Sequence, residues 1–272
     1  MLAVDSYNVW KLDTDEYSIA QIKDLYNVVA SNGGGNALYS KLINATHLSQ
    51  DRVAEFLGTR LLRQGEFAEA ADYFRKVSLD YISQQGITPY LMLRPMVSSP
   101  FNRITYNELD GEEFGTATNR KLEFCELAEQ YRQTFTTARD KEERAQAGCN
   151  LARLLFHGSA AGDLWAISQY SHSSYEHYNE LDSIAVGYLQ QAVRLTSDPQ
   201  LADLCYFGLA AIPDSHDVVY YRWDEDQQAP YLLTPTKRQF DAYERIRTHR
   251  CKEPLYDGCD WLGLYARMAS ND

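Results

Sequence analysis

The sequence predicts an all-α protein built as a right-handed stack of helical hairpins, and three observations support this fold class. Apolar residues recur three or four positions apart over most of the chain, as on one face of an α-helix. Short breaks rich in Gly, Pro or Ser divide these segments into pairs. With 44% hydrophobic and 24% charged residues, the composition is that of a folded globular protein rather than a disordered chain. We therefore expect one domain over residues 1–272, interrupted by an irregular insertion.

The clearest hairpin spans residues 51–83. Two amphipathic segments meet at Gly65, and Gly58 leaves room for a neighbouring helix to approach closely. The apolar positions at helical spacing are Val53, Phe56, Leu57, Leu61 and Leu62 in the first helix, and Phe67, Ala70, Ala71, Phe74 and Val77 in the second.

The order of large and small residues across this hairpin resembles the tetratricopeptide repeat, over about one repeat length of 34 residues. The matching positions are Leu57, Gly58, Leu61, Gly65, Phe67, Ala70, Phe74 and Val77, while Ile82 stands where a closing proline is expected. The resemblance implies a superhelix whose concave side receives a protein or peptide partner.

Two more hairpins are predicted, at 141–170 and 181–212. In the second of these, Asp198 and Pro199 form a typical helix start. The segment 86–118 contains three prolines and no steady period, so we read it as the irregular insertion. Further helices are expected at 16–30, 37–48, 119–138 and 236–250, and a short strand or extended segment at 218–223.

A second resemblance covers more than half of the chain, from about Val53 to Pro213. The run from Asn119 through FCELAEQY and GDLWAISQYS to YFGLAAIP is similar to an uncharacterised family of repeat proteins common in Bacteroidetes. This similarity implies the same tetratricopeptide-like fold and a cell-envelope setting. The family has no established activity that the similarity could imply for this chain.

Charge excludes two classes of partner. The net charge is −12, and no run of Lys or Arg is longer than a pair, which argues against nucleic acid and against an anionic membrane surface. No stretch of 18 apolar residues occurs, so no membrane insertion is expected. Residues Met1–Trp10 lack the pattern of an export signal, which leaves the chain soluble as given and its compartment open.

The motifs that might carry chemistry are weak. The glycine run in NGGGN, residues 32–36, has no following Lys-Ser or Lys-Thr, so it predicts an interhelix turn rather than a phosphate loop. His172 and His177 are five positions apart, which does not place two metal ligands on one helix face. The five cysteines lack CxxC spacing and read as small hydrophobes. We expect no catalytic site, no metal and no cofactor.

What remains is a binding surface along the first helix of each hairpin. The residues predicted to line this groove are Arg52, Glu55, Thr59 and Leu62 in the first hairpin, and Arg153 and Phe156 in the second. The alternative for these six is ordinary surface or contact with the next hairpin.

The chain is thus interpreted as a non-enzymatic interaction or scaffold module for a protein or peptide partner. The rival hypothesis is carbohydrate binding or processing, with an aromatic surface formed by the insertion, from Tyr90, Phe101, Tyr106 and Phe114. Trp165 and Tyr170 are either a second exposed aromatic platform or part of the core.

Overall fold

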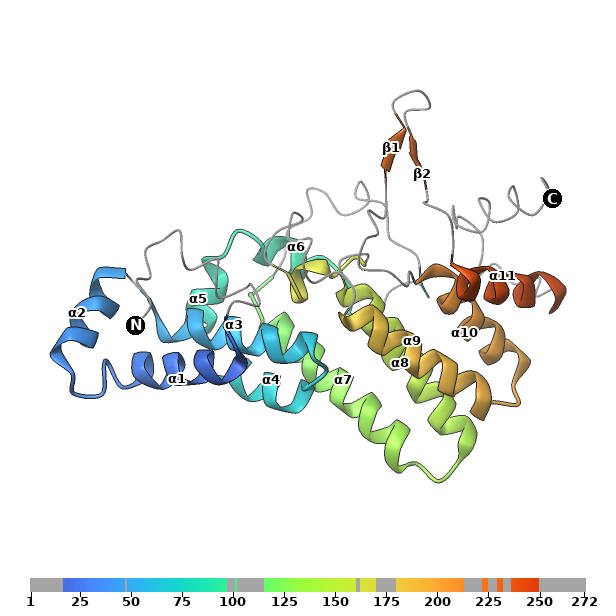
Figure 1. Ribbon diagram of the computed structural model, residues 1–272, viewed down its shortest axis with the longest axis horizontal. Helices are drawn as coiled ribbons and strands as arrows, with labels where there is room; N and C mark the ends of the chain where they lie inside the picture. The colour runs from blue at the N-terminus through green and yellow to red at the C-terminus, as the bar shows by residue number, and fades with distance from the viewer. Residues whose placement is uncertain are drawn as a thin grey trace. The chain divides into compact units, whose positions relative to one another are not determined.

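The computed structural model describes residues 17–46, 48–96, 101, 115–159, 162–169, 180–212, 222–224, 229–231 and 236–249. These residues form an all-α fold, as predicted, with one short antiparallel strand pair (Figure 1). Residue contacts divide the chain into two compact units. Unit 1 takes in Met1–Leu93, Gly111–Leu127 and Ile167–Tyr170, and unit 2 takes in the remainder. That residues 1–272 behave as a single domain stays a prediction.

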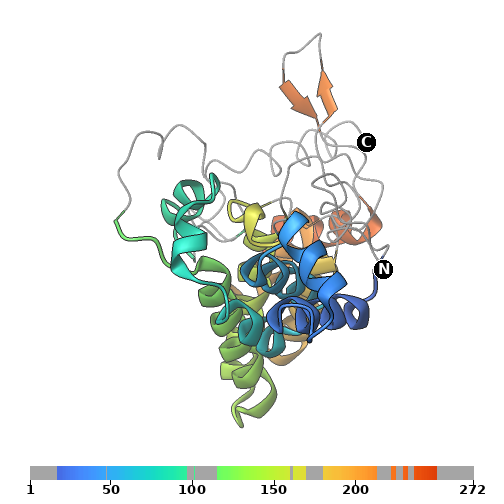
Figure 2. The ribbon, with the colours of Figure 1, turned by 90° about the vertical axis from the view of Figure 1, so that its left-hand side faces the viewer.

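Unit 1 is built around the helix α3. Helix α1 packs against α3, and α3 packs against α4; the three lie side by side in both views (Figures 1 and 2). The predicted hairpin is confirmed as α3 and α4, which meet at Gly65 with its left-handed φ of 80°. The helices of this unit are α1 (Ile19–Ala30), α2 (Ala37–Thr46), α3 (Gln50–Arg63), α4 (Phe67–Phe74), α5 (Leu79–Ser83), α6 (Thr88–Met92) and the start of α7 (Arg120–Thr137).

The turn between α1 and α2 is a left-handed one, made by residues 32–36. Asn32, Gly33, Gly34 and Gly35 all have positive φ, a conformation that glycine and asparagine adopt with little strain. The amides of Asn32 and Gly33 donate to Val29 and Val28 carbonyls, the paired bonds of a Schellman C-cap. The prediction of an interhelix turn is therefore confirmed, although the turn has a defined hydrogen-bond pattern.

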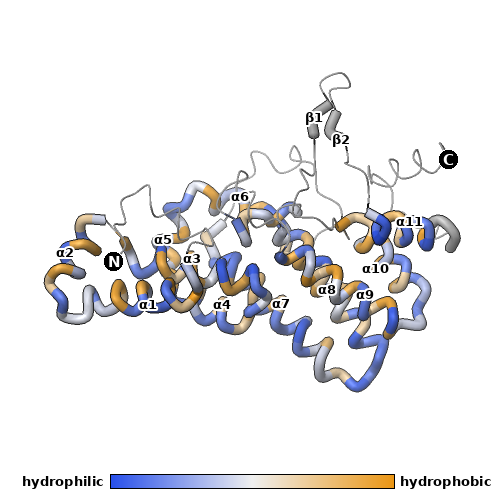
Figure 3. The backbone as a smooth tube through the Cα atoms, in the orientation of Figure 1, coloured by the Kyte–Doolittle hydropathy of each residue, from blue (hydrophilic) through white to orange (hydrophobic). Residues whose placement is uncertain are grey.

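Unit 2 is a series of helices in which each packs against the next: α8 on α9, α9 on α10, and α10 on α11. Apolar positions recur along each of these helices (Figure 3). Asp198 caps α10 by accepting from the Gln200 amide at 2.9 Å, as predicted. The elements are the rest of α7, α8 (Lys141–Gly158), η3 (Trp165–Ile167, whose last residue is assigned to unit 1), α9 (Glu180–Leu195), α10 (Pro199–Ala211), β1 (Arg222–Asp224), β2 (Ala229–Tyr231) and α11 (Lys237–His249).

The predicted hairpin over 141–170 is wrong in its second half. Among residues 162–169, which the structure describes, the chain forms the three-residue 3₁₀-helix η3 and no α-helix, and α8 packs mainly against α9. The predicted hairpin over 181–212 is confirmed as α9 and α10. The apolar spacing of Leu164 and Ile167 arises because both side chains are buried, and burial alone does not require a helix.

Two other expectations are met in part. The segment 86–118 contains the short helix α6, and 97–100 and 102–114 lie outside the described residues. The strand expected at 218–223 corresponds to β1, which pairs with β2 in the register Arg222 with Tyr231; residues 218–221 are not described.

Glu142 joins the start of α8 to the turn between α9 and α10. Its carboxylate accepts from the amide and hydroxyl of Ser197, the latter at 2.6 Å, and from the hydroxyl of Thr196. These donors stabilise the charged form and hold the pKa of Glu142 at about 2, below its ordinary 4.5.

Because the folded-state pKa of Glu142 is depressed, the stabilisation is complete above pH 4.5 and is lost as the pH falls toward 2. We expect the difference in unfolding free energy between wild type and Glu142→Gln to shrink over this window. Urea unfolding at a series of pH values measures it. A difference that stays constant with pH would show that the carboxylate is not clasped in the folded state.

Candidate functional site

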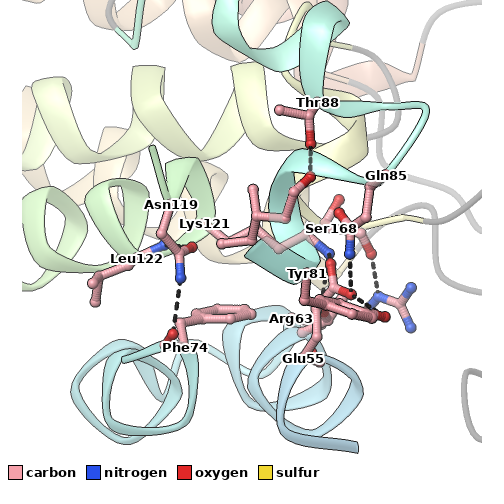
Figure 4. A network of polar contacts seen from close by, with 12 residues as sticks. Glu55, Arg63, Phe74, Tyr81, Gln85, Thr88, Asn119, Lys121, Leu122 and Ser168 are labelled. Carbon is pink, nitrogen blue, oxygen red and sulfur yellow. Dashed lines mark hydrogen bonds and ion pairs between the residues drawn. The ribbon is translucent and has the colours of Figure 1, made fainter. Parts of the chain in front are cut away.

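A buried polar cluster in unit 1 is the most distinctive chemical feature of the described residues. Glu55 of α3 forms an ion pair with Lys121 of α7, at 2.9 Å between Oε1 and Nζ, and both side chains are less than a tenth exposed. The second carboxylate oxygen of Glu55 accepts from Gln85 Nε2 at 2.8 Å and from the Tyr81 hydroxyl at 3.4 Å. Figure 4 shows these groups pointing toward one another, with Glu55 on α3, Tyr81 on α5, Lys121 on α7 and Gln85 between α5 and α6. We call Glu55, Lys121, Tyr81, Gln85 and Thr59 the Glu55 cluster.

Thr59 completes the cluster one turn after Glu55. Its hydroxyl accepts from Lys121 Nζ at 3.2 Å and donates to the Glu55 carbonyl at 2.9 Å. A buried charge is tolerated when it is paired and its remaining sites are hydrogen-bonded, and both conditions hold for Glu55. The cluster therefore fixes how α3, α5 and the start of α7 pack together.

Three hydrogen bonds to backbone carbonyls surround the cluster (Figure 4). Asn119 caps α7 by accepting from the Leu122 amide, and its own amide group donates to the Phe74 carbonyl at 2.8 Å. Arg63 donates from Nε to the Ser168 carbonyl at 2.6 Å. Thr88 donates to the Ile82 carbonyl at 2.5 Å. The Phe74 and Ile82 carbonyls also accept from the backbone amides of Val77 and Gln85, so these side chains add a second donor near the helix ends.

Burial and the neighbouring Glu55 carboxylate raise the pKa of Tyr81 to about 12. The phenol is therefore neutral at physiological pH and can act only as a hydrogen-bond donor or acceptor. A tyrosine that serves as a general base needs the opposite shift, toward the working pH. The electrostatics of the cluster favour a structural role for Tyr81.

A small pocket lies beside the cluster. The space open to the centre of a water molecule is about 20 Å³, which holds about one ordered water and not a metabolite. Its lining is Glu55, Phe74, Val77, Ile82, Gln85, Thr88, Leu91, Thr118, Asn119, Arg120 and Lys121.

The six predicted groove residues are mostly not at the surface. Glu55 and Thr59 belong to the buried cluster, and Leu62 and Phe156 are core residues, the last packed on Phe101 with ring centroids 5.6 Å apart. Arg52 and Arg153 remain partly exposed. The expectation of an open groove is therefore wrong for four of the six. For Glu55 and Thr59 the reason is that α3 is covered on its second face by the elements that carry Tyr81, Gln85 and Lys121.

The carbohydrate hypothesis predicts an aromatic surface that includes Phe101, and the structure does not place Phe101 at the surface. Phe101 is fully buried and packs against Phe156 and Phe207 in unit 2. Tyr90 is partly exposed, and Tyr106 and Phe114 lie outside the described residues. Trp165 is buried, as in the core interpretation, and Tyr170 is not described. Carbohydrate binding stays a prediction without a described aromatic platform.

Across the described parts of the chain, no three His, Cys, Asp or Glu side chains gather closely enough to hold a metal ion. His172 and His177 lie outside those parts. No helix within the described ranges is both long enough and apolar enough to cross a bilayer.

Two side chains that reach the surface, Arg52 and Leu79, lie near the starts of α3 and α5. Asp51 accepts from the amide and hydroxyl of Ser78, at 2.7 and 3.0 Å, and so ties the start of α3 to the start of α5. Leu79 follows Ser78 and is 54% exposed, one of two large hydrophobic side chains that stand out at the surface of the described residues. Arg52, next to Asp51, is partly exposed and lies close enough to influence the Tyr81 hydroxyl.

Comparison with known proteins adds no further constraint: no family model, no curated protein and no solved structure matches this chain.

Proposed function

We propose that the chain is a non-enzymatic interaction module of helical-repeat type, a right-handed tetratricopeptide-like stack that binds a protein or peptide partner. The observation that supports this most is the packing of α8 to α11 in unit 2, in which each of these helices contacts the next one along the chain. Stability in repeat proteins comes from such nearest-neighbour interfaces, and their long surfaces serve recognition.

In this proposal the partner contacts the partly exposed Arg52 together with the exposed Leu79, at the joined starts of α3 and α5. Arginine is enriched among the residues that contribute most to binding, and the exposed Leu79 offers apolar area that a partner can bury. The polar Glu55 cluster lies beneath them and holds α3 and α5 in a fixed relation, which lowers the entropy lost on binding.

Affinity capture of the tagged chain tests this proposal. We expect Arg52→Glu combined with Leu79→Asp to lose a partner that the wild type retains, with a drop in capture of at least about tenfold, as for a loss of 1.4 kcal/mol. Thr59 is unsuitable for such a test because it is fully buried, and a charge there would disrupt the fold.

Lys237→Glu is the matched control, because Lys237 is 87% exposed and lies on α11 of unit 2. The control variant should retain the partner. Equal loss with both variants would indicate binding through net charge alone, and capture unaffected by either would place the binding surface elsewhere. Circular dichroism of each variant confirms that the helices are intact.

A further inference from the structure

Two tyrosine rings of unit 1 share one cation. Tyr26 lies on α1 and Tyr73 on α4, with ring centroids 5.4 Å apart and ring planes at 85° to each other. The Lys76 ammonium lies over both rings, at 4.1 Å from the Tyr73 centroid and 5.0 Å from the Tyr26 centroid. A ring face attracts a cation that lies within about 6 Å of its centroid. We call Tyr26 and Tyr73 the tyrosine corner, because both rings attract the same positive charge.

The tyrosine corner is held in place by contacts other than those with Lys76. Tyr26 is 8% exposed, and its hydroxyl accepts from Gln50 Nε2 of α3 at 2.8 Å. Burial and this hydrogen bond fix the Tyr26 ring before any ligand arrives, which lowers the entropy lost on binding. Tyr73 is partly exposed, and Lys76 is an exposed residue of the turn after α4. A cation from solution can therefore reach the corner when the flexible Lys76 side chain moves aside.

We propose that the tyrosine corner is a binding site for a quaternary ammonium group, and that Lys76 fills it as a built-in competitor in the free chain. Aromatic rings that face one cation together recognise quaternary ammonium groups in this way. The proposal goes beyond the partner surface described above, because the corner shares no residue with Arg52 and Leu79. A small solute such as choline and a trimethylated lysine of a peptide both present this group.

The chemistry of the corner favours a quaternary ammonium over a primary one. The Lys76 ammonium is strongly hydrated and carries three N–H donors, whereas ring faces are weak acceptors. A quaternary ammonium has no N–H group to satisfy, and its methyl groups bury apolar area against the rings. The net charge of −12 disfavours an anion. A quaternary ammonium from solution can therefore compete with the tethered Lys76.

Displacement of Lys76 leaves the neighbouring ion pairs intact. The carboxylates of Glu69 and Asp72, on the same helix as Tyr73, pair with Lys23 at 2.6 Å and with Arg75 at 2.7 Å. Moving Lys76 off the rings breaks neither pair. A cation–π contact at an exposed site changes an equilibrium by about two- to fivefold, and this sets how strongly Lys76 competes.

Titration of the full chain with choline, followed by the NMR signal of its N-methyl protons, tests the proposal. We expect a saturable upfield shift, because the methyl groups lie over ring faces. Lys76→Met should bind choline about two- to fivefold more tightly than the wild type, since the competitor is gone. The neutral alcohol in which carbon replaces the choline nitrogen has the same shape and should give no saturable shift. Equal affinity of Lys76→Met and the wild type would overturn the competitor role.

Changes at Tyr73 in the Lys76→Met background locate the site. Tyr73→Leu should abolish the saturable shift, whereas Tyr73→Phe should retain it because the ring remains. Tyr39→Leu is the matched control, since Tyr39 is a partly exposed tyrosine of α2 outside the corner, and it should bind choline normally. Circular dichroism of each variant checks that the helices are intact.

A peptide that carries one trimethyllysine separates the two sources of the ligand. Tighter binding of this peptide than of choline assigns the corner to a protein partner, and the reverse assigns it to a small solute. The same peptide with unmodified lysine should bind more weakly, and equal binding would overturn the preference for a quaternary group.

Two further results would overturn the site itself. Lys76→Met without saturable choline binding would show that Lys76 makes an ordinary surface contact with the two rings. Binding that persists unchanged in Tyr73→Leu would show that the acidic chain attracts cations without a defined site. Neither result bears on the surface of Arg52 and Leu79, which partner capture tests separately.

Discussion

Lys121→Met is expected to destabilise unit 1 by about 3–5 kcal/mol, the cost of removing one partner from a buried ion pair. The Glu55 carboxylate would remain buried, with Gln85 and Tyr81 as its only side-chain donors among the contacts that the structure shows. Urea unfolding followed by circular dichroism measures the loss. Hydrogen exchange along α3 assigns that loss to unit 1.

Replacing both partners provides the sharper experiment. In Glu55→Gln combined with Lys121→Met neither charge remains, so much of the loss in the single variant should be recovered. Arg75→Met is the matched control, because Arg75 is half exposed and pairs with Glu126 at 2.9 Å on the surface; its cost should stay below about 1 kcal/mol. A double variant no more stable than Lys121→Met would mean that packing, rather than the unpaired charge, sets the cost.

Most of the helices could be predicted from the sequence, because apolar residues three or four positions apart indicate a helix with one buried face. The expected helices at 16–30, 37–48, 119–138 and 236–250 agree with α1, α2, α7 and α11 to within three residues at each end. The sequence likewise predicts the break between α3 and α4 at Gly65, since a glycine between two amphipathic segments indicates a turn.

The Glu55 cluster could not be predicted from the sequence in the same way. Glu55 and Thr59 lie on the side of the first helix away from its contact with the second, so the sequence predicts an open groove there, in keeping with the usual exposure of glutamate and threonine. Their partner Lys121 follows Glu55 by 66 residues and carries no local signal that it pairs with α3. Residue type predicts average exposure, whereas the burial of a particular charge depends on a long-range partner.

The error at 141–170 has a related cause. Leu164, Trp165 and Ile167 are buried, and their spacing suits either a helix or an irregular segment lying on the core. The sequence also does not tell which later segment packs against α8, since α9 and η3 both offer apolar side chains. Pairing between segments is a tertiary property, and periodicity within one segment leaves it undetermined.

Glycine-to-alanine changes in two helices of this chain are expected to have opposite effects on stability. A Cβ at Gly58 of α3 would lie 2.7 Å from Phe74 Cε1, and two further carbons of that ring would lie within 2.9 Å. Phe74 is itself buried, so the ring cannot move away freely, and the overpacking should cost about 1–3 kcal/mol. At Gly187 of α9 a Cβ would meet nothing within 4 Å, and alanine should stabilise by up to about 1 kcal/mol through its helix propensity.

Unfolding of Gly58→Ala and Gly187→Ala in urea, side by side, measures both signs. Phe74→Leu added to Gly58→Ala should recover part of the loss, because the smaller side chain removes the ring atoms nearest the new methyl group. If Gly58→Ala were as stabilising as Gly187→Ala, the close approach of α3 and α4 that the large and small residue pattern predicts would be absent. Gly58 lies within α3 and is not among the positive-φ residues of the described chain, so its backbone conformation does not require glycine. A clash confirmed by the double variant would therefore show that the packing of this hairpin requires glycine at position 58.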